Sequence, residues 1–426
     1  MRAARVRARG RGGLATAALL VVVTTVGPSL APAAAQGEES RAEIQRLLDR
    51  RAQALIERDR DAFLATISDD NEAFRDRQED LFEGFASMDL AEYSLEANWS
   101  RYGDLARRSD ARRYDGARVM LPLTEERYRI RGFDAAPAVE DMFFTFVERD
   151  GRWLIANDSD LESLGLFSGR HPWDFGSVSV THTGNFLLIQ TARGGCASTP
   201  ADLAPTAQRA LDRVKTYWTP PWRKKVILVV PCNGEELQRM LQATFDPSKF
   251  VAFAYSSLDV ENGYRFTGHR VIVNPPVFNG RGADETLSIL AHELLHVASR
   301  DVSGPFVPLL VDEGVADLVG YAGAAGALGF LDSVVATGGF DGSLPDDFAF
   351  SIGSGSEIFL SYQEAHSAMS FIADGWGRKA VIDLYVNLGA RGYEPGLARW
   401  HLDDALRATL GIGLKAFEQR WADSIA

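Results

Sequence analysis

The sequence of 426 residues contains only two cysteines, and no segment after its first 35 residues is long and apolar enough to span a membrane. Two cysteines exclude a disulfide scaffold and a cysteine-rich metal cluster. Basic residues are fewer than acidic ones, 45 against 58, and the formal charge is −13. Because such a surface repels phosphate backbones, we expect no nucleic-acid partner. The 46% of apolar and 24% of charged residues are typical of a globular protein of two or three domains.

Residues 1–35 are typical of a secretory leader, or signal peptide. They contain five arginines and no acid, an apolar stretch from Leu14 to Val26, and three alanines at 33–35. A membrane anchor is the alternative, but a spanning helix needs about 20 apolar residues and this stretch is shorter. We therefore expect a secreted, extracellular or periplasmic protein that keeps no stable membrane span after leader removal. Losing the five arginines takes its formal charge from −13 to −18.

An oxidising compartment bears on the two cysteines. Cys196 and Cys232 can pair there, and on a chain-entropy model the bridge stabilises by about 3–4 kcal/mol. Two buried free thiols are the alternative.

The mature chain begins with a helical pattern and continues with strand-like alternation. Apolar residues recur at three- and four-residue spacing from Glu38 to about Ile67, which predicts a long helix. Alternating runs predict strands at Glu92–Trp99, Tyr128–Ile130, Met142–Glu148 and Trp153–Asn157. Helices followed by antiparallel strands, with the closing string D-G-R-W-L-I, resemble the α+β cone of the NTF2-like (SnoaL-like) group over residues 38–165.

Members of that group hold a small ligand inside the cone or mediate contacts. Trp153, Phe143 and Tyr128 are therefore either pocket lining or core residues, and core packing is the preferred interpretation. Residues 166–177 lack a sustained period and contain two glycines and a proline, so we expect a linker there. A second domain then covers residues 178–426.

The strongest chemical signal is the string H-E-L-L-H at 292–296, inside a helical pattern from about Ala283 to Ser299. Four residues advance an α-helix by about 6 Å and one full revolution, so His292 and His296 present their imidazoles side by side. Two neutral imidazoles chelate zinc, and Glu293 projects where its carboxylate can take a proton from a zinc-bound water. The five-residue pattern arises by chance in about one such chain in a hundred, so the motif alone only suggests a metal site. A third ligand is needed.

The segment V-D-E-G-V-A-D at 311–317 supplies a third ligand. Pro308 can open a helix in which Glu313 and Asp317 lie one turn apart on the same face. Glu313 then completes a set of two histidines and one carboxylate, and Asp317 can accept a hydrogen bond from His292. Small residues at 314 and 316 allow the two helices to approach closely. A solvated acidic face is the alternative interpretation of these carboxylates.

The combination of H-E-x-x-H with a following E-G-x-A-D resembles the gluzincin metallopeptidases of the MA-like superfamily, over roughly residues 178–426. The resemblance implies that His292, His296 and Glu313 bind Zn²⁺ and that Glu293 is the catalytic base. Ser299 and Val302 stand where the metzincin branch has a glycine and its third histidine, which argues against that branch.

The same resemblance implies a hydrogen-bond donor to the oxyanion that forms during hydrolysis. Tyr362 holds the matching position, and His366, one helical turn further on, is the alternative; both can instead be packing or surface residues. The chain departs from the group at Val311, where an aromatic residue is common, but Val311 is not a proposed ligand. The remaining histidines have no partner at metal-binding spacing and are expected to be surface or core residues: His171, His182, His269 and His401.

The predicted fold class is α+β, with an NTF2-like cone followed by a zincin-like domain that has a small mixed sheet and a mostly helical carboxyl-terminal part. The strands of that sheet are predicted at Val178–Gln190, Lys225–Val230, Val251–Ser256 and Arg270–Val273. Val251–Tyr255 is the strand we expect at an edge, where an extended peptide can pair with it.

The leading hypothesis is a secreted zinc-dependent peptidase whose partner is a peptide or protein substrate. The alternative is a catalytically inactive binding protein, in which the cone binds a ligand or partner and the zinc site is structural or vestigial. Glu293 favours the enzyme, because zinc retention alone does not require it.

Overall fold

The computed structural model describes residues 31–196, 199, 201–242, 250–304, 307–392 and 397–425, with side chains from residue 36 onward. Residues 1–30, most of the predicted leader, lie outside the described residues, so the leader stays a prediction. The chain divides into Met1–Ala42 and Glu43–Ala426. In the first unit the described residues form the start of helix α1 (Ala31–Glu57). Every helix in the described part of the chain is too short or too polar to cross a membrane.

The single long helix predicted from residue 38 to 67 is two helices in the structure. After α1 the chain turns at Arg58, whose φ is +59°, and the Asp59 side chain caps α2 (Arg60–Leu64) by accepting a hydrogen bond from the Ala62 amide. Asn71 caps α3 (Glu72–Phe85) in the same way.

Two three-stranded antiparallel sheets follow these helices. The first has the order β1-β3-β4 and the second the order β2-β5-β6, with a short helix, α4 (Arg108–Arg113), between β1 and β2. Their strands are β1 (Leu90–Asn98), β2 (Val119–Met120), β3 (Leu123–Ile130), β4 (Ala138–Met142), β5 (Thr145–Arg149) and β6 (Arg152–Asn157). Trp153, Phe143 and Tyr128 are all buried, and Tyr128 borders a cavity of about 30 Å³.

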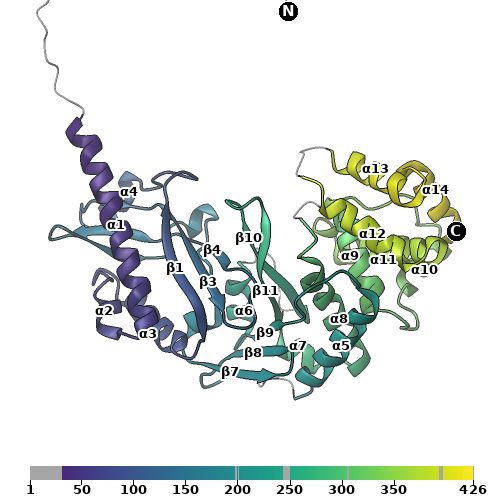
Figure 1. The fold of residues 1–426 in the computed structure, drawn as a ribbon, viewed down its shortest axis with the longest axis horizontal. Helices are drawn as coiled ribbons and strands as arrows, with labels where there is room; N and C mark the ends of the chain where they lie inside the picture. Colours follow the sequence, from purple (N-terminus) through teal and green to yellow (C-terminus); the bar gives the residue numbers. More distant parts are fainter. Residues whose placement is uncertain are drawn as a thin grey trace, which may run out of the picture. The chain divides into compact units, whose positions relative to one another are not determined.

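A five-stranded mixed sheet with the order β10-β11-β9-β8-β7 lies between the β1-β3-β4 sheet and the later helices (Figure 1). Its inner pairs are parallel and its two outer pairs are antiparallel. The predicted strand at 178–190 is a hairpin, because Gly184 has φ +59° and the chain reverses there. The strands are β7 (Val178–Thr183), β8 (Phe186–Thr191), β9 (Val226–Val230), β10 (Ala252–Asp259) and β11 (Arg265–Val273).

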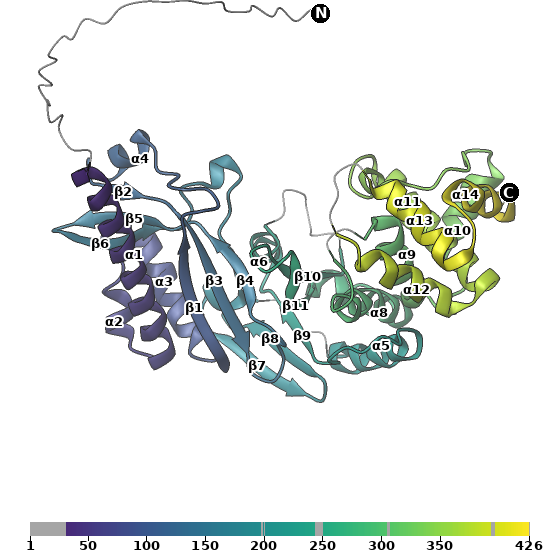
Figure 2. The ribbon, with the colours of Figure 1, turned by 45° about the horizontal axis from the view of Figure 1, so that its top comes forward.

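The other main elements of the described residues are helices. The chain forms α5 (Leu203–Tyr217), α6 (Gly234–Met240) and α7 (Pro275–Asn279) around the sheet, then α8 (Ala283–Ser299) and α9 (Leu309–Gly320). The last helices gather at the carboxyl-terminal end (Figure 2): α10 (Gly329–Ala336), α11 (Gly355–Trp376), α12 (Arg378–Gly389), α13 (Ala398–Leu410) and α14 (Leu414–Ile425). The predicted α+β class, mixed sheet and mostly helical carboxyl-terminal part are therefore confirmed.

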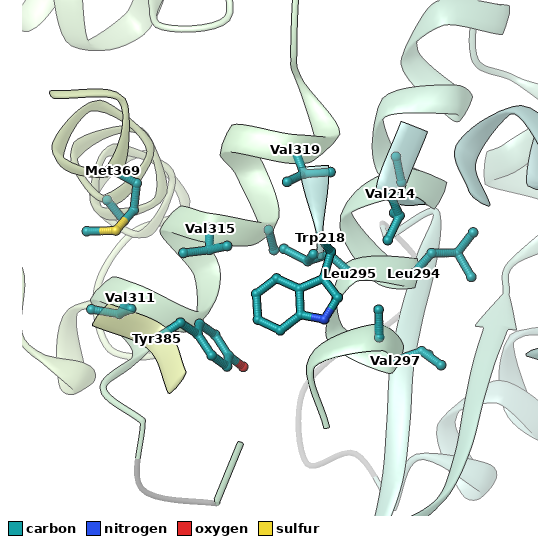
Figure 3. Close-up of a cluster of buried hydrophobic side chains, with 14 of the residues drawn as sticks. Val214, Trp218, Leu294, Leu295, Val297, Val311, Val315, Val319, Met369 and Tyr385 are labelled. Atoms are coloured by element: carbon teal, nitrogen blue, oxygen red, sulfur yellow. The ribbon is translucent and has the colours of Figure 1, made fainter. Parts of the chain in front are cut away.

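Helices α8 and α9 are fixed by a buried apolar cluster (Figure 3). Trp218 packs edge-on against Tyr385 with ring centroids 5.2 Å apart. Glycines allow the helices to approach: a Cβ on Gly314 would lie 2.6 Å from the Ala365 carbonyl oxygen of α11, and one on Gly320 would lie 2.8 Å from the Ser288 carbonyl oxygen of α8. Gly314 thus brings α9 against α11, and Gly320, which the sequence interpretation did not use, brings α9 against α8.

Residues 166–177, predicted to be a linker, are largely buried. A short 3₁₀ helix at Pro172–Phe175 packs on α3, where a Cβ on Gly84 would lie 2.5 Å from the Trp173 carbonyl oxygen. One apolar core also runs from the amino-terminal helices into the five-stranded sheet. The domain limits of 38–165 and 178–426 stay a prediction. A disulfide joins Cys196, which follows β8, to Cys232, which follows β9.

Candidate metal centre

The H-E-L-L-H string lies in the middle of α8, as its periodicity predicts. Asp284 and Glu285 occupy the first turn, where free backbone N–H groups favour negative charge. Leu290, Leu294 and Val297 are buried in the apolar cluster. His292, Glu293 and His296 lie toward the other side, and their ligand atoms are all within 4.8 Å of one another.

Three ligand atoms from α8 and α9 form a nearly equilateral triangle. The Nε2 atoms of His292 and His296 are 3.1 Å apart. Glu313 Oε2 lies 3.2 Å from the first of these atoms and 3.5 Å from the second. A tetrahedral zinc ion with bonds of about 2.0–2.1 Å separates its ligand atoms by about 3.3–3.4 Å. The donor set and its spacing therefore fit zinc.

A carboxylate hydrogen-bonds the outer nitrogen of His292, and another carboxylate faces the outer nitrogen of His296. Asp317 Oδ1 lies 2.7 Å from His292 Nδ1, the contact expected from the sequence. Asp312 Oδ1 faces His296 Nδ1 at 3.5 Å. An outer proton directed at a carboxylate leaves the inner nitrogen free to bind a metal.

The sequence did not predict that Asp312 faces His296. Asp312 also accepts hydrogen bonds from the Tyr385 hydroxyl, at 2.5 Å, and from Arg300, at 3.2 Å. Tyr385 in turn contacts the Ser299 hydroxyl at 2.9 Å. The only signal for the role of Asp312 in the sequence was its position directly before Glu313.

Negative charge is concentrated around the two imidazoles. Burial disfavours a proton on His296, but the carboxylates of Asp312 and Glu313 outweigh it and raise the pKa of His296 to about 9. Burial alone would raise the pKa of Glu313, and the imidazoles instead lower it to about 2. Four carboxylates surround the pair: Glu293, Asp312, Glu313 and Asp317. This excess favours a divalent cation between them.

Glu293 is held from the sheet side. Its Oε2 accepts a hydrogen bond of 2.6 Å from the backbone N–H of Ala254, in the edge strand β10. Burial raises the pKa of Glu293, although the two histidines act against this rise. A buried carboxylate next to the ligand triangle is suited to accept a proton.

A cavity lies next to the candidate metal centre, and Tyr362 and His366 both border it from one face of α11. The cavity has a volume of about 810 Å³ and also borders His292 and Glu293. The Tyr362 ring packs against Phe350, and burial together with Glu313 raises its pKa. Burial lowers the pKa of His366. In the described part of the chain neither side chain hydrogen-bonds a candidate ligand atom, so their roles remain predictions.

Tyr321 is a third aromatic residue at this cavity, and the sequence interpretation did not select it. Its ring lies 6.2 Å from that of His366, and burial, with Asp317 nearby, raises its pKa. No motif marks it, because it follows the last turn of α9.

No protein-family model, curated protein or solved structure matches this chain.

The rest of the cavity wall is largely apolar. It is formed by α8, by the residues that lead into β10 and by the first turns of α11, and a volume of this size accommodates a ligand as large as a short peptide. The apolar residues that line it include Phe250, Val251, Ile289, Ile358 and Phe359.

The four other histidines have different partners. His171 is buried and lies 2.7 Å from Glu126, and His269 Nδ1 lies 2.9 Å from the Ser256 hydroxyl. His182 packs against Phe133, and His401 packs against the indole ring of Trp400.

Proposed function

We propose that the protein is a secreted zinc-dependent peptidase of the gluzincin type, preceded by an NTF2-like domain at residues 38–165. The carrying observation is the triangle of two imidazole nitrogens and one carboxylate oxygen, with edges of 3.1–3.5 Å. His292, His296 and Glu313 would hold the ion. The disulfide between Cys196 and Cys232 supports export, because such bonds persist in oxidising compartments.

The donor set supports a catalytic rather than a structural zinc. Structural sites have four protein ligands, whereas catalytic sites have three and leave one position open. Asp312 and Asp317 face the outer nitrogens of the histidines, so in the described part of the chain they act as supporting groups and not as a fourth ligand. The cavity of about 810 Å³ borders the open side.

His292, His296 and Glu313 would hold zinc, which would supply Lewis-acid chemistry to the attacking water and the scissile carbonyl. Glu293 accepts the proton of the attacking water and returns it to the leaving amine, while the Ala254 N–H keeps its carboxylate in place. Tyr362, or His366 one turn further on, donates a hydrogen bond to the oxyanion. β10 is an edge strand, and its other outward backbone groups can pair with an extended peptide.

The test combines metal analysis of the mature protein with cleavage of an unbiased peptide library, with and without chelator. Glu293→Gln is expected to keep the wild-type zinc content and lose hydrolysis by at least about a hundredfold. Glu83→Gln, at an exposed position on α3 that does not border the cavity, is the matched control and is expected to keep both. Undiminished cleavage by the Glu293 variant would show that another group is the base. A zinc-loaded wild-type protein that cleaves no library member would instead favour the binding-protein alternative.

A further inference from the structure

We propose that the amino-terminal half of the protein positions the catalytic base, because Glu140 fixes the edge strand whose backbone holds Glu293. Glu140 is thus a positioning residue for hydrolysis. The inference rests on the proposed peptidase function.

The first link joins β4 to β10, which pack against each other (Figures 1 and 2). Glu140 is only 5% exposed, and both of its carboxylate oxygens accept hydrogen bonds from β10. The Tyr255 hydroxyl donates at 2.7 Å and the Ser257 hydroxyl at 2.6 Å. Side chains two residues apart share a face of a strand, so one carboxylate fixes two successive positions on that face.

The second link leaves β10 toward α8. Ala254 is paired with Val271 of β11, but its N–H donates to Glu293 Oε2 at 2.6 Å. The rigid peptide plane between Ala254 and Tyr255 adjoins, at the Ala254 Cα, the plane that carries the Ala254 N–H. A displacement of the Tyr255 anchor therefore moves the amide that holds the base.

Two further contacts keep β4 and its neighbouring loop at a fixed distance from the sheet. Gly268 of β11 has φ +57°, and a Cβ there would lie 2.4 Å from the Cβ of Ala138 at the start of β4. Arg270 of β11 forms a buried two-pronged ion pair with Asp134, with N–O distances of 2.6 and 3.0 Å. The amino-terminal half is thus anchored to β11 and braces β10 from there.

We call the hydrogen bonds from Tyr255 and Ser257 to Glu140 the brace. The brace matters because β10 has a paired strand on one side only. An edge strand has half the backbone hydrogen bonds of an inner strand, so its position depends more on side-chain contacts. A misplacement of about 1 Å in a catalytic group can cost a hundredfold in rate. The hydrogen bonds from Tyr255 and Ser257 to Glu140 are thus suited to set the position of β10 and, through it, of Glu293.

The experiment compares Tyr255→Phe and Glu140→Gln with two controls in the zinc-loaded full-length mature protein. Ser256→Ala removes a β10 hydroxyl that contacts His269 within the sheet. Arg223→Ala removes a different contact between the halves, to the carbonyl oxygens of Gly132 and Asp134. For each variant we would measure kcat and KM on an extended peptide, zinc content, and hydrogen–deuterium exchange at the Ala254 amide.

We expect kcat to fall about tenfold in both brace variants, with KM changed less than threefold and zinc content unchanged. The Ala254 amide should exchange about tenfold faster in these variants, and both controls should match the wild type. Wild-type kcat and protection in Tyr255→Phe and Glu140→Gln, or equal losses in the controls, would overturn the inference. Ser257→Ala replaces either brace variant that fails to fold, with the same expectations. A wild-type protein without peptidase activity refutes the proposed function instead, and in that case the exchange rate at Ala254 still decides whether the brace exists.

Discussion

The carboxylate behind His292 is the clearest place to perturb the candidate site without touching a ligand. Asp317 Oδ1 lies 2.7 Å from His292 Nδ1, and its side chain is 11% exposed. The contact fixes the imidazole tautomer and makes the inner nitrogen a better donor. Removing such a supporting group typically lowers metal affinity by about 10–100-fold, which is about 1.4–2.7 kcal/mol.

The two substitutions at this position should have different effects. Asp317→Asn retains an oxygen that can accept the Nδ1 proton and loses only the charge, so we expect about a tenfold weaker zinc affinity. Asp317→Ala loses the acceptor as well and should approach a hundredfold. The assay is competition for zinc against a chelator of known affinity. Asp284→Asn, an exposed change of the same charge on α8, is the matched control. Wild-type affinity in Asp317→Ala would refute the reasoning, and so would an equal loss in the control.

Three further predictions concern stability. Burial and Asp341 raise the pKa of Glu364 from 4.5 to about 7, so ionisation of this side chain opposes folding. The free energy of unfolding should therefore fall as the pH rises from about 4.5 through 7. Glu364→Gln should remove this fall and gain about 1–2 kcal/mol at pH 8, as measured by urea titration. Replacing Cys196 and Cys232 by serine should lower the free energy of unfolding by about 3–4 kcal/mol, and an unchanged urea midpoint would contradict this. Gly314→Ala should cost about 1–3 kcal/mol, because its Cβ meets the Ala365 backbone; an unchanged melting temperature would show that α9 and α11 can separate freely.

The ligand triangle could be predicted because its parts are local in the sequence. His292 and His296 are one turn apart on one helix, and Glu313 and Asp317 are one turn apart on the next. Only the approach of α9 to α8 had to be assumed. The structure supplies it through Gly320, which meets α8 at Ser288.

Contacts between distant parts of the chain could not be predicted. Tyr385 reaches Asp312 from 73 residues away, and Tyr255 reaches Glu140 from 115 residues away. Neither pair has a spacing that a periodic pattern can reveal. The burial of residues 166–177 could not be predicted for the same reason, because polar residues there find partners such as Glu126 far away in the sequence.

Strand positions were predicted better than strand limits. Alternation located β1, β3, β6 and the strands of the mixed sheet, because it records which side chains face the core. Turns were less visible: the chain reverses at Gly184 inside one predicted strand, and β4 and β5 divide another. Apolar residues continue through both turns, so the pattern does not mark them.

The zinc coordination of the mature protein tests the central claim most directly. X-ray absorption spectroscopy on the zinc-loaded wild type should give one ion per chain with two imidazole nitrogens and oxygen ligands at about 2.0–2.1 Å, and Glu313→Ala should lose most of its zinc. Full zinc occupancy in Glu313→Ala with an unchanged spectrum would contradict the assignment of Glu313 and the site built on it.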